Sequence, residues 1–282
     1  MPYYSRRLWV LLIVLDPLPW PWGEKVLAFL CLVRFMARSS GRRNALAWAS
    51  AQRRGRRWRL AAAVCAFTGR SIARWRFLGF RSPEELRSLV VVDGEQHLSS
   101  VSGGAILLTF HLGPPTSHLL LRLRGHDVRF LGRHDRIAAA EWWSEAWHPI
   151  VASSPLSSGA EDLKRWVAVL HSARRSLLDG GKICIMADGG IGRELFRAAV
   201  PGGVMVVRAG WLTLHRLTGA PVLPVLTHLE GQRQVITIHP PLPLGEVDAA
   251  QRLETWREIL TSLVVGYVRR FPDQCPGLAG VW

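Results

Sequence analysis

Two kinds of hydrophobic pattern alternate along this 282-residue chain: short continuous apolar runs and longer stretches with helical periodicity. The short runs are bounded by glycine, proline or charged residues and predict buried strands at residues 105–110, 128–131, 183–187, 222–226 and 235–238. Helical patterns lie between them, in a short helix opening at Pro83 and at residues 119–123, 137–147, 162–178, 207–217 and 250–270. Strands that alternate with helices predict an α/β fold, a mixed sheet with substantial parallel pairing, flanked by helices.

The first 40 residues have a different pattern. Two apolar runs, 8–15 and 26–33, are separated by an aspartate and three prolines. Each run is far shorter than the ~20 residues that a membrane-spanning helix needs. Tryptophans at positions 9, 20 and 22 favour the headgroup level of a bilayer. We interpret residues 1–40 as a hydrophobic membrane-associated segment, an interfacial hairpin or short re-entrant anchor. The alternative is a helix that only packs on the following domain.

Charge is distributed unevenly. The formal net charge is +15, and residues 26–83 hold thirteen arginines and no acidic residue. Arginines in residues 42–67 alternate with apolar positions at helical spacing, which predicts amphipathic helices with a basic face. Such a face attracts anionic lipid or a phosphorylated substrate. Nucleic acid would be attracted by the same charge, but the sequence has no zinc-finger, RNP or glycine-clamp motif, and nucleic acid is therefore the weaker interpretation.

The remaining composition predicts one domain over residues 41–282, with the arginine-rich helices at its start, because no linker or internal repeat divides this part. The four cysteines are widely scattered and none has the spacing of a metal site or a disulfide framework. We therefore expect no bound metal, no disulfide and a reducing, cytosolic environment.

His111 directly follows the predicted strand 105–110, and Asp188 directly follows the predicted strand 183–187. Ligands of open α/β sheets bind at the carboxyl ends of the strands, and an imidazole there can accept a proton near neutral pH. If the two strands are parallel neighbours, both side chains reach the same edge. The alternative for Asp188 is a structural cap of the turn Gly189-Gly190.

Several segments in a fixed order give the chain a resemblance to a known family. They are residues 93–98, the segment 103–113 that contains His111, residues 183–188, Arg208-Ala209-Gly210, residues 218–225 and the closing segment 269–274. Over roughly residues 40–282 the chain resembles the bacterial lipid A biosynthesis (lauroyl/myristoyl) acyltransferases of the lysophospholipid acyltransferase superfamily.

This resemblance implies an O-acyltransferase without a bound cofactor. The acyl chain would come from an acyl carrier protein or acyl coenzyme A thioester, and the acceptor would be a hydroxyl of a glycolipid or lysophospholipid. His111 would be the general base. The expected location is the cytoplasmic face of the bacterial inner membrane, as a peripheral or singly anchored protein.

The sequence departs from the family signature at one position. Members carry Asp or Glu five residues after the histidine, where this chain has Thr116. A threonine hydroxyl can orient an imidazole ring but contributes no charge. We therefore expect Asp188 to replace the missing carboxylate and to make the imidazole a stronger base.

Further residues are candidates for substrate binding. Arg133 matches a family position where a basic residue contacts anionic groups, and Arg193 lies in a glycine-rich segment suited to a phosphate or to the pantetheine of a carrier. Arg208 lies beside Gly210 at a predicted helix start, where a helix N-terminus would help to bind a phosphate. Gly113 and Thr116, in and just beyond the matched segment, complete the set. For each arginine the alternative is an ordinary surface residue.

Two other functions stay open at this point. Thr116 in place of the signature acid favours an acyltransferase-like protein with impaired catalysis that binds lipid or an assembly partner. The basic charge alone favours a nucleic-acid-binding protein.

Overall fold

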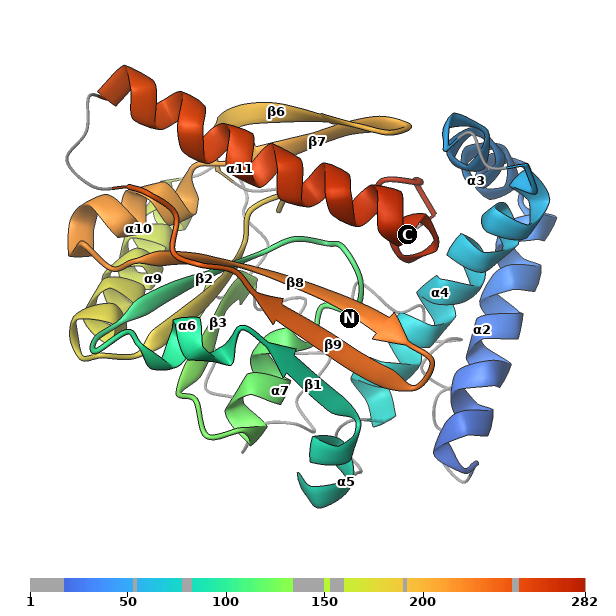
Figure 1. Ribbon diagram of the computed structural model, residues 1–282, viewed down its shortest axis with the longest axis horizontal. Helices are drawn as coiled ribbons and strands as arrows, with labels where there is room; N and C mark the ends of the chain where they lie inside the picture. Colours follow the sequence, from blue (N-terminus) through green and yellow to red (C-terminus); the bar gives the residue numbers. More distant parts are fainter. Residues whose placement is uncertain are drawn as a thin grey trace.

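A computed structural model of the chain (Figure 1) describes residues 18–52, 55–77, 83–133, 150–152, 160–189, 192–244 and 249–281. The helices are α2 (Trp20–Ala37), α3 (Ser39–Ala51), α4 (Arg57–Phe77), α5 (Pro83–Ser88), α6 (Glu95–Ser99), α7 (Ser117–Leu123), α9 (Ala160–Leu178), α10 (Gly210–Thr218), α11 (Ala249–Arg270) and a 3₁₀ turn at Pro272–Gln274. The strands are β1 (Val90–Asp93), β2 (Ala105–Thr109), β3 (Val128–Arg133), β4 (Ile150–Ala152), β5 (Lys182–Met186), β6 (Glu194–Val200), β7 (Gly203–Arg208), β8 (Val222–Glu230) and β9 (Arg233–Ile238).

Seven strands form one sheet in the order β1-β9-β8-β2-β5-β3-β4. Strands β8, β2, β5, β3 and β4 are mutually parallel, β9 runs antiparallel to β8, and β1 is parallel to β9. The predicted α/β fold with a mixed sheet flanked by helices is therefore confirmed. In the pairing of β2 with β5, Ala105 is opposite Lys182 and Thr109 is opposite Met186, so both strands end at the same edge.

Helices cover both faces of the sheet (Figure 1). Successive side chains of a strand point to opposite faces, and in β2 they enter two separate cores. Ile106 and Leu108 belong to a core shared with α9, α10, α11 and the arginine-rich helices, whereas Leu107 belongs to a core formed with α5, α6 and α7. Burial on both faces explains why the strand reads as a continuous apolar run rather than an alternating one.

The predicted elements are found, with one correction. The apolar runs form β2, β3, β5, β8 and β9, and the patterns at Pro83, 119–123, 162–178 and 250–270 form α5, α7, α9 and α11. The helix expected over 207–217 begins only at Gly210, because Val207 and Arg208 end β7. The helix expected over 137–147 lies outside the described residues.

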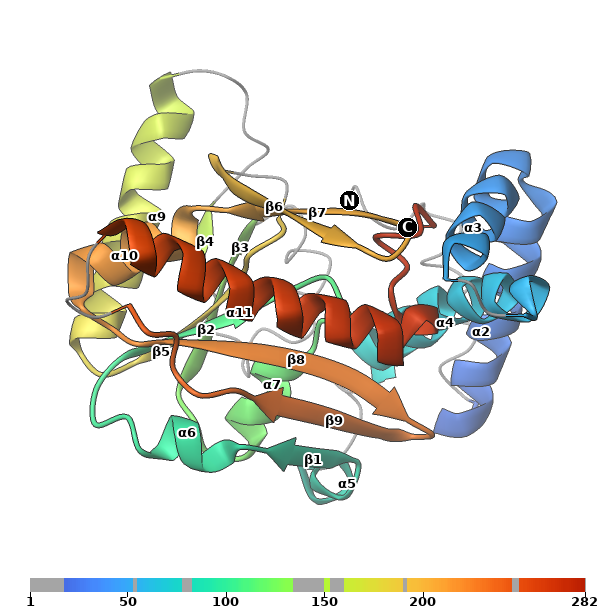
Figure 2. The same ribbon diagram turned by 45° about the horizontal axis from the view of Figure 1, so that its top comes forward.

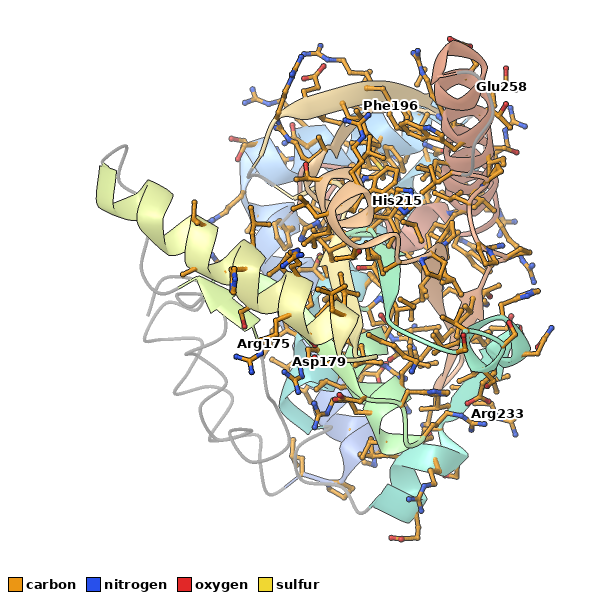
Figure 3. The ribbon with its side chains drawn as sticks, turned by 90° about the vertical axis from the view of Figure 1, so that its left-hand side faces the viewer. Arg175, Asp179, Phe196, His215, Arg233 and Glu258 are labelled. Atoms are coloured by element: carbon orange, nitrogen blue, oxygen red, sulfur yellow. The ribbon has the colours of Figure 1, made fainter. Side chains whose placement is uncertain are left out.

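Strands β1 and β4 have no counterpart among the predicted elements, and neither has the hairpin β6–β7. The hairpin packs beside α11 and extends toward α3 (Figure 2). Phe196 of β6, labelled in Figure 3, lies edge-on to Trp256 of α11, with ring centroids 5.7 Å apart. The hairpin turn is fixed at its tip, where the side chain of Gln52, the residue after α3, donates to the Pro201 carbonyl over 2.8 Å. This hairpin links the loop after β5 to the amino-terminal helices.

The second amino-terminal apolar run lies within α2, while the first run and residues 1–17 lie outside the described residues. Helix α2 packs against α4 so closely that position 69 requires glycine, since a Cβ there would lie 2.2 Å from the Leu27 carbonyl oxygen. The buried Glu24 forms ion pairs with Arg70 and Arg74 of α4. In the part of the chain described, no helix is long and apolar enough to cross a membrane.

Candidate active site

The carboxyl ends of β2 and β5 bring His111 and Asp188 together. Thr109 and Met186 are the last paired residues of the two strands, and each candidate residue lies two positions further along its own chain. The backbone continues the pairing beyond the strands, because the Ala187 N–H donates to the Thr109 carbonyl over 2.8 Å. The predicted meeting of the two side chains at one sheet edge is therefore present.

One carboxylate contacts His111 at two places. Nδ1 of the imidazole lies 2.9 Å from Oδ1 of Asp188, and the His111 backbone N–H donates to both carboxylate oxygens over 3.0 Å. The His111 side chain is 28% exposed and the Asp188 side chain 13%. A carboxylate on Nδ1 favours the tautomer with its proton on that nitrogen, which places the lone pair of the neutral ring on Nε2. The arrangement is that of an oriented general base.

Gly113 is buried and holds the loop that follows His111 against β8 and the carboxyl-terminal segment. Its φ of +68° lies in the left-handed region, and a Cβ there would come 1.8 Å from the Thr227 carbonyl oxygen. Its N–H donates to the Gln274 carbonyl over 2.9 Å. The backbone N–H groups of His111 and Gly113 are both occupied by protein acceptors, so an oxyanion at this edge would need donors from elsewhere.

Thr116 is also turned into the protein. It is fully buried, and its hydroxyl donates to Oε1 of Gln234 in β9 over 3.0 Å. The structure does not bring Thr116 to the His111–Asp188 pair. Thr116, at the position of the signature acid, therefore ties the loop to β9, while the carboxylate at the imidazole comes from the segment that follows β5.

Two of the three arginine candidates lie near Asp188: Arg208 ends β7, and Arg193 lies in the segment before β6. The Arg208 N–H donates to the carbonyl of Ala187, the residue before Asp188, over 2.6 Å. The half-buried Arg208 guanidinium contacts the Gly192 carbonyl at 3.2 Å, and the Ala209 N–H donates to the carbonyl of the exposed Arg193 over 2.9 Å. These contacts tie the backbones of Arg208 and Arg193 to the segment that carries Asp188.

The backbone of the third arginine candidate, Arg133, also lies at the carboxyl edge of the sheet. Arg133 ends β3, which pairs in parallel with β5, and it lies opposite Ala152 of β4. Its side chain lies outside the described residues. The described part of the chain contains no group of three or more His, Cys, Asp or Glu side chains able to hold a metal ion.

His118, seven residues after His111, has a different environment. It is 2% exposed and stacks on Phe130 with ring centroids 4.6 Å apart. Burial, assisted by the charge of Arg122, lowers the pKa of His118 to about 3. This histidine is therefore a neutral core residue near pH 7.

Sequence reasoning missed three residues that hold the His111 loop: Gln234, Tyr267 and Gln274. Tyr267 donates its hydroxyl to the Thr227 carbonyl over 2.8 Å, and the buried Gln274 pairs with Leu229. A signal in the sequence existed only for Gln274, which lies in the closing segment 269–274 of the resemblance.

The chain was also compared with known proteins. No protein-family model matches it, and no curated protein matches its sequence.

Proposed function

We propose that this protein is an O-acyltransferase that moves a fatty acyl chain from a carrier-protein or coenzyme A thioester to a hydroxyl of a glycolipid or lysophospholipid. The observation that carries the proposal is the His111–Asp188 pair at the carboxyl edge of the sheet, with the ring partly exposed. The resemblance in segment order along residues 93–274 supplies the reaction class.

The reaction follows from the orientation of the ring. Nε2 of His111 takes the proton of the acceptor hydroxyl while its oxygen attacks the thioester carbonyl carbon. The tetrahedral intermediate collapses, the C–S bond breaks, and the imidazolium returns the proton to the leaving thiolate. Asp188 holds Nδ1 and stabilises the positive charge that the ring carries between these steps. Arg208 and Arg193, whose backbones are tied to the segment of Asp188, are candidates to bind the oxyanion or a substrate phosphate.

The amino-terminal helices support a location at a membrane surface. Trp22, Phe29 and Val33 are 60%, 63% and 48% exposed on α2, and their spacing places them on one face of the helix. The opposite face, with Leu27 and Cys31, is buried against α4. An exposed apolar stripe on α2, together with exposed arginines on α3 and α4, suits the anionic, cytoplasmic face of a bacterial inner membrane.

The decisive experiment is an acyl-transfer assay on the full chain with His111→Ala. Labelled acyl carrier protein and labelled acyl coenzyme A are offered separately, with bacterial membrane lipid as acceptor. We expect wild-type transfer and a loss of about 10²–10⁴-fold in the variant. His171→Ala, on the exposed side of α9, is the matched control and should keep wild-type transfer. Full activity of His111→Ala would refute the proposal.

A second candidate function is lipid binding without catalysis. Thr116 in place of an acid, with its hydroxyl turned to Gln234, favours it. In that case the wild-type chain would bind vesicles but transfer no acyl group from either donor, and His111→Ala would leave vesicle binding unchanged.

A further inference from the structure

Strand β8 is longer than its neighbour β2, which leaves part of its edge to be satisfied by other groups. The two strands pair only from Ile106–Val222 to Leu108–Pro224, whereas β8 continues to Glu230. The tight turn to β9 makes Glu230 and Arg233 the last pair of that hairpin. Hydrogen-bonding direction alternates along an antiparallel strand, so the peptide groups of Leu229 and Thr227 point to the side where β2 has ended.

Two side chains from the carboxyl-terminal part of the protein fill this edge. The Tyr267 hydroxyl donates to the Thr227 carbonyl over 2.8 Å. Gln274 pairs with both groups of Leu229: its Oε1 accepts the N–H over 2.8 Å and its Nε2 donates to the carbonyl over 2.9 Å. Gln274 is 4% exposed, so it replaces a strand partner at a site from which water is largely excluded.

The backbone of Gln274 also holds the loop that carries His111. Its carbonyl accepts the Gly113 N–H over 2.9 Å, and Gly113 lies two residues after His111 against the Thr227 carbonyl. The 3₁₀ turn Pro272–Gln274 is itself held by Trp48 of α3, whose indole N–H donates to the Pro272 carbonyl over 2.9 Å. Gln274 therefore connects the free edge of β8 to the loop of the candidate base.

We infer that Gln274 is a positioning residue for His111, an inference that rests on the proposed function. Only a side chain with one acceptor and one donor satisfies both groups of Leu229. Methionine has a similar shape but leaves a buried N–H and a buried carbonyl unpaired. An ionised glutamate places a second oxygen against the Leu229 carbonyl, whereas protonated glutamate can donate there as the amide does.

Hydrogen exchange tests the inference without relying on activity. In the full chain with Gln274→Met or Gln274→Glu at pH 8, we expect the peptide containing Gly113 to exchange at least about tenfold faster than in the wild type. Gln96→Met, at an exposed site of α6, should leave exchange unchanged. Wild-type exchange at Gly113 in both Gln274 variants would overturn the inference.

Kinetics separate positioning from general destabilisation. For Gln274→Glu we expect kcat to fall about tenfold at pH 8 with KM unchanged, and the ratio of variant to wild-type kcat to rise as pH falls and the carboxyl takes up a proton. A ratio independent of pH, or a loss confined to KM, would contradict a positioning role. If the wild type transfers no acyl group, the proposed function fails, and the exchange measurement still decides whether Gln274 holds the loop.

Discussion

His111 and Asp188 are joined through both the ring and the backbone of the histidine. The carboxylate contacts Nδ1 at 2.9 Å and accepts the His111 N–H over 3.0 Å. The residue that orients the imidazole therefore also fixes the turn that presents it. Seventy-seven residues separate the two positions in the sequence, and the parallel pairing of β2 with β5 brings them together.

Asp188→Asn should reduce acyl transfer about 10³- to 10⁴-fold while leaving the protein folded. The amide oxygen can still accept the His111 N–H, but it carries no charge to stabilise the imidazolium and tolerates the wrong tautomer. Initial rates at saturating donor measure the effect. Asp179→Asn, at the exposed end of α9 (Figure 3), is the control. Wild-type rates in Asp188→Asn would remove this carboxylate from the mechanism.

Restoring the signature acid should not rescue that loss. Thr116 is fully buried and directed at Gln234, so a carboxylate at position 116 would face the amide of β9 rather than the ring. We expect the double variant Thr116→Asp/Asp188→Asn to be no more active than Asp188→Asn alone and to be less stable, because it buries a charge. Recovery of transfer in the double variant would show that the loop can present an acid to His111.

Gly113→Ala should destabilise the protein more than Gly125→Ala. Both glycines have positive φ, +68° and +94°, but a Cβ at Gly125 meets nothing within 4 Å while one at Gly113 meets the Thr227 carbonyl oxygen at 1.8 Å. The backbone strain common to both costs about 1–3 kcal/mol, and the clash adds about 1–3 kcal/mol for Gly113. Urea unfolding gives both values, and equal losses would contradict the close approach.

His118→Phe should reduce the sensitivity of the fold to acid. The pKa of His118 is lowered to about 3 by burial, whereas in the unfolded chain it is near 6.5. Between these values the unfolded state binds the extra proton, so this residue lowers wild-type stability as pH falls, by up to about 1.4 kcal/mol per pH unit.

The wild type and His118→Phe should differ in the slope of the free energy of unfolding against pH. Free energies of unfolding at pH 7, 6, 5 and 4 should fall less steeply in His118→Phe, while any constant difference above pH 7 reports lost packing on Phe130. Parallel curves for the two proteins would show that His118 is not held neutral.

The exposed stripe on α2 should mediate vesicle binding. Replacing Trp22, Phe29 and Val33 together by serine removes apolar surface that would enter the bilayer, at roughly 1 kcal/mol for each side chain. We expect at least about a tenfold weaker partition onto vesicles with anionic lipid. The control replaces three other exposed apolar residues by serine, Val167, Leu178 and Leu217. Equal binding of both triple variants would refute the role of α2.

The sequence by itself determined the buried strands β2 and β5 and the exits of His111 and Asp188, but not β1, β4, the hairpin β6–β7 or the extension of β8 to Glu230. Strand β2 is buried on both faces, and such a strand produces an uninterrupted apolar run that predicts its own position and the exit of His111. Segments of this kind depend on local composition. The predicted helix over 207–217 begins too early for a related reason. Val207 and Arg208 continue the apolar pattern of the helix that follows, although they belong to β7.

Only the tertiary structure decided which strand ends are neighbours and which side chains meet there. The order β8-β2-β5 arises from packing helices on both faces, a long-range property that no short segment contains. It places Asp188 at the imidazole and directs Thr116 to Gln234, although Thr116 is much nearer to His111 in sequence. The role of Gln274 depends on β8 extending beyond β2, because only the assembled sheet leaves Leu229 without a strand partner on that side and lets Gln274 take its place.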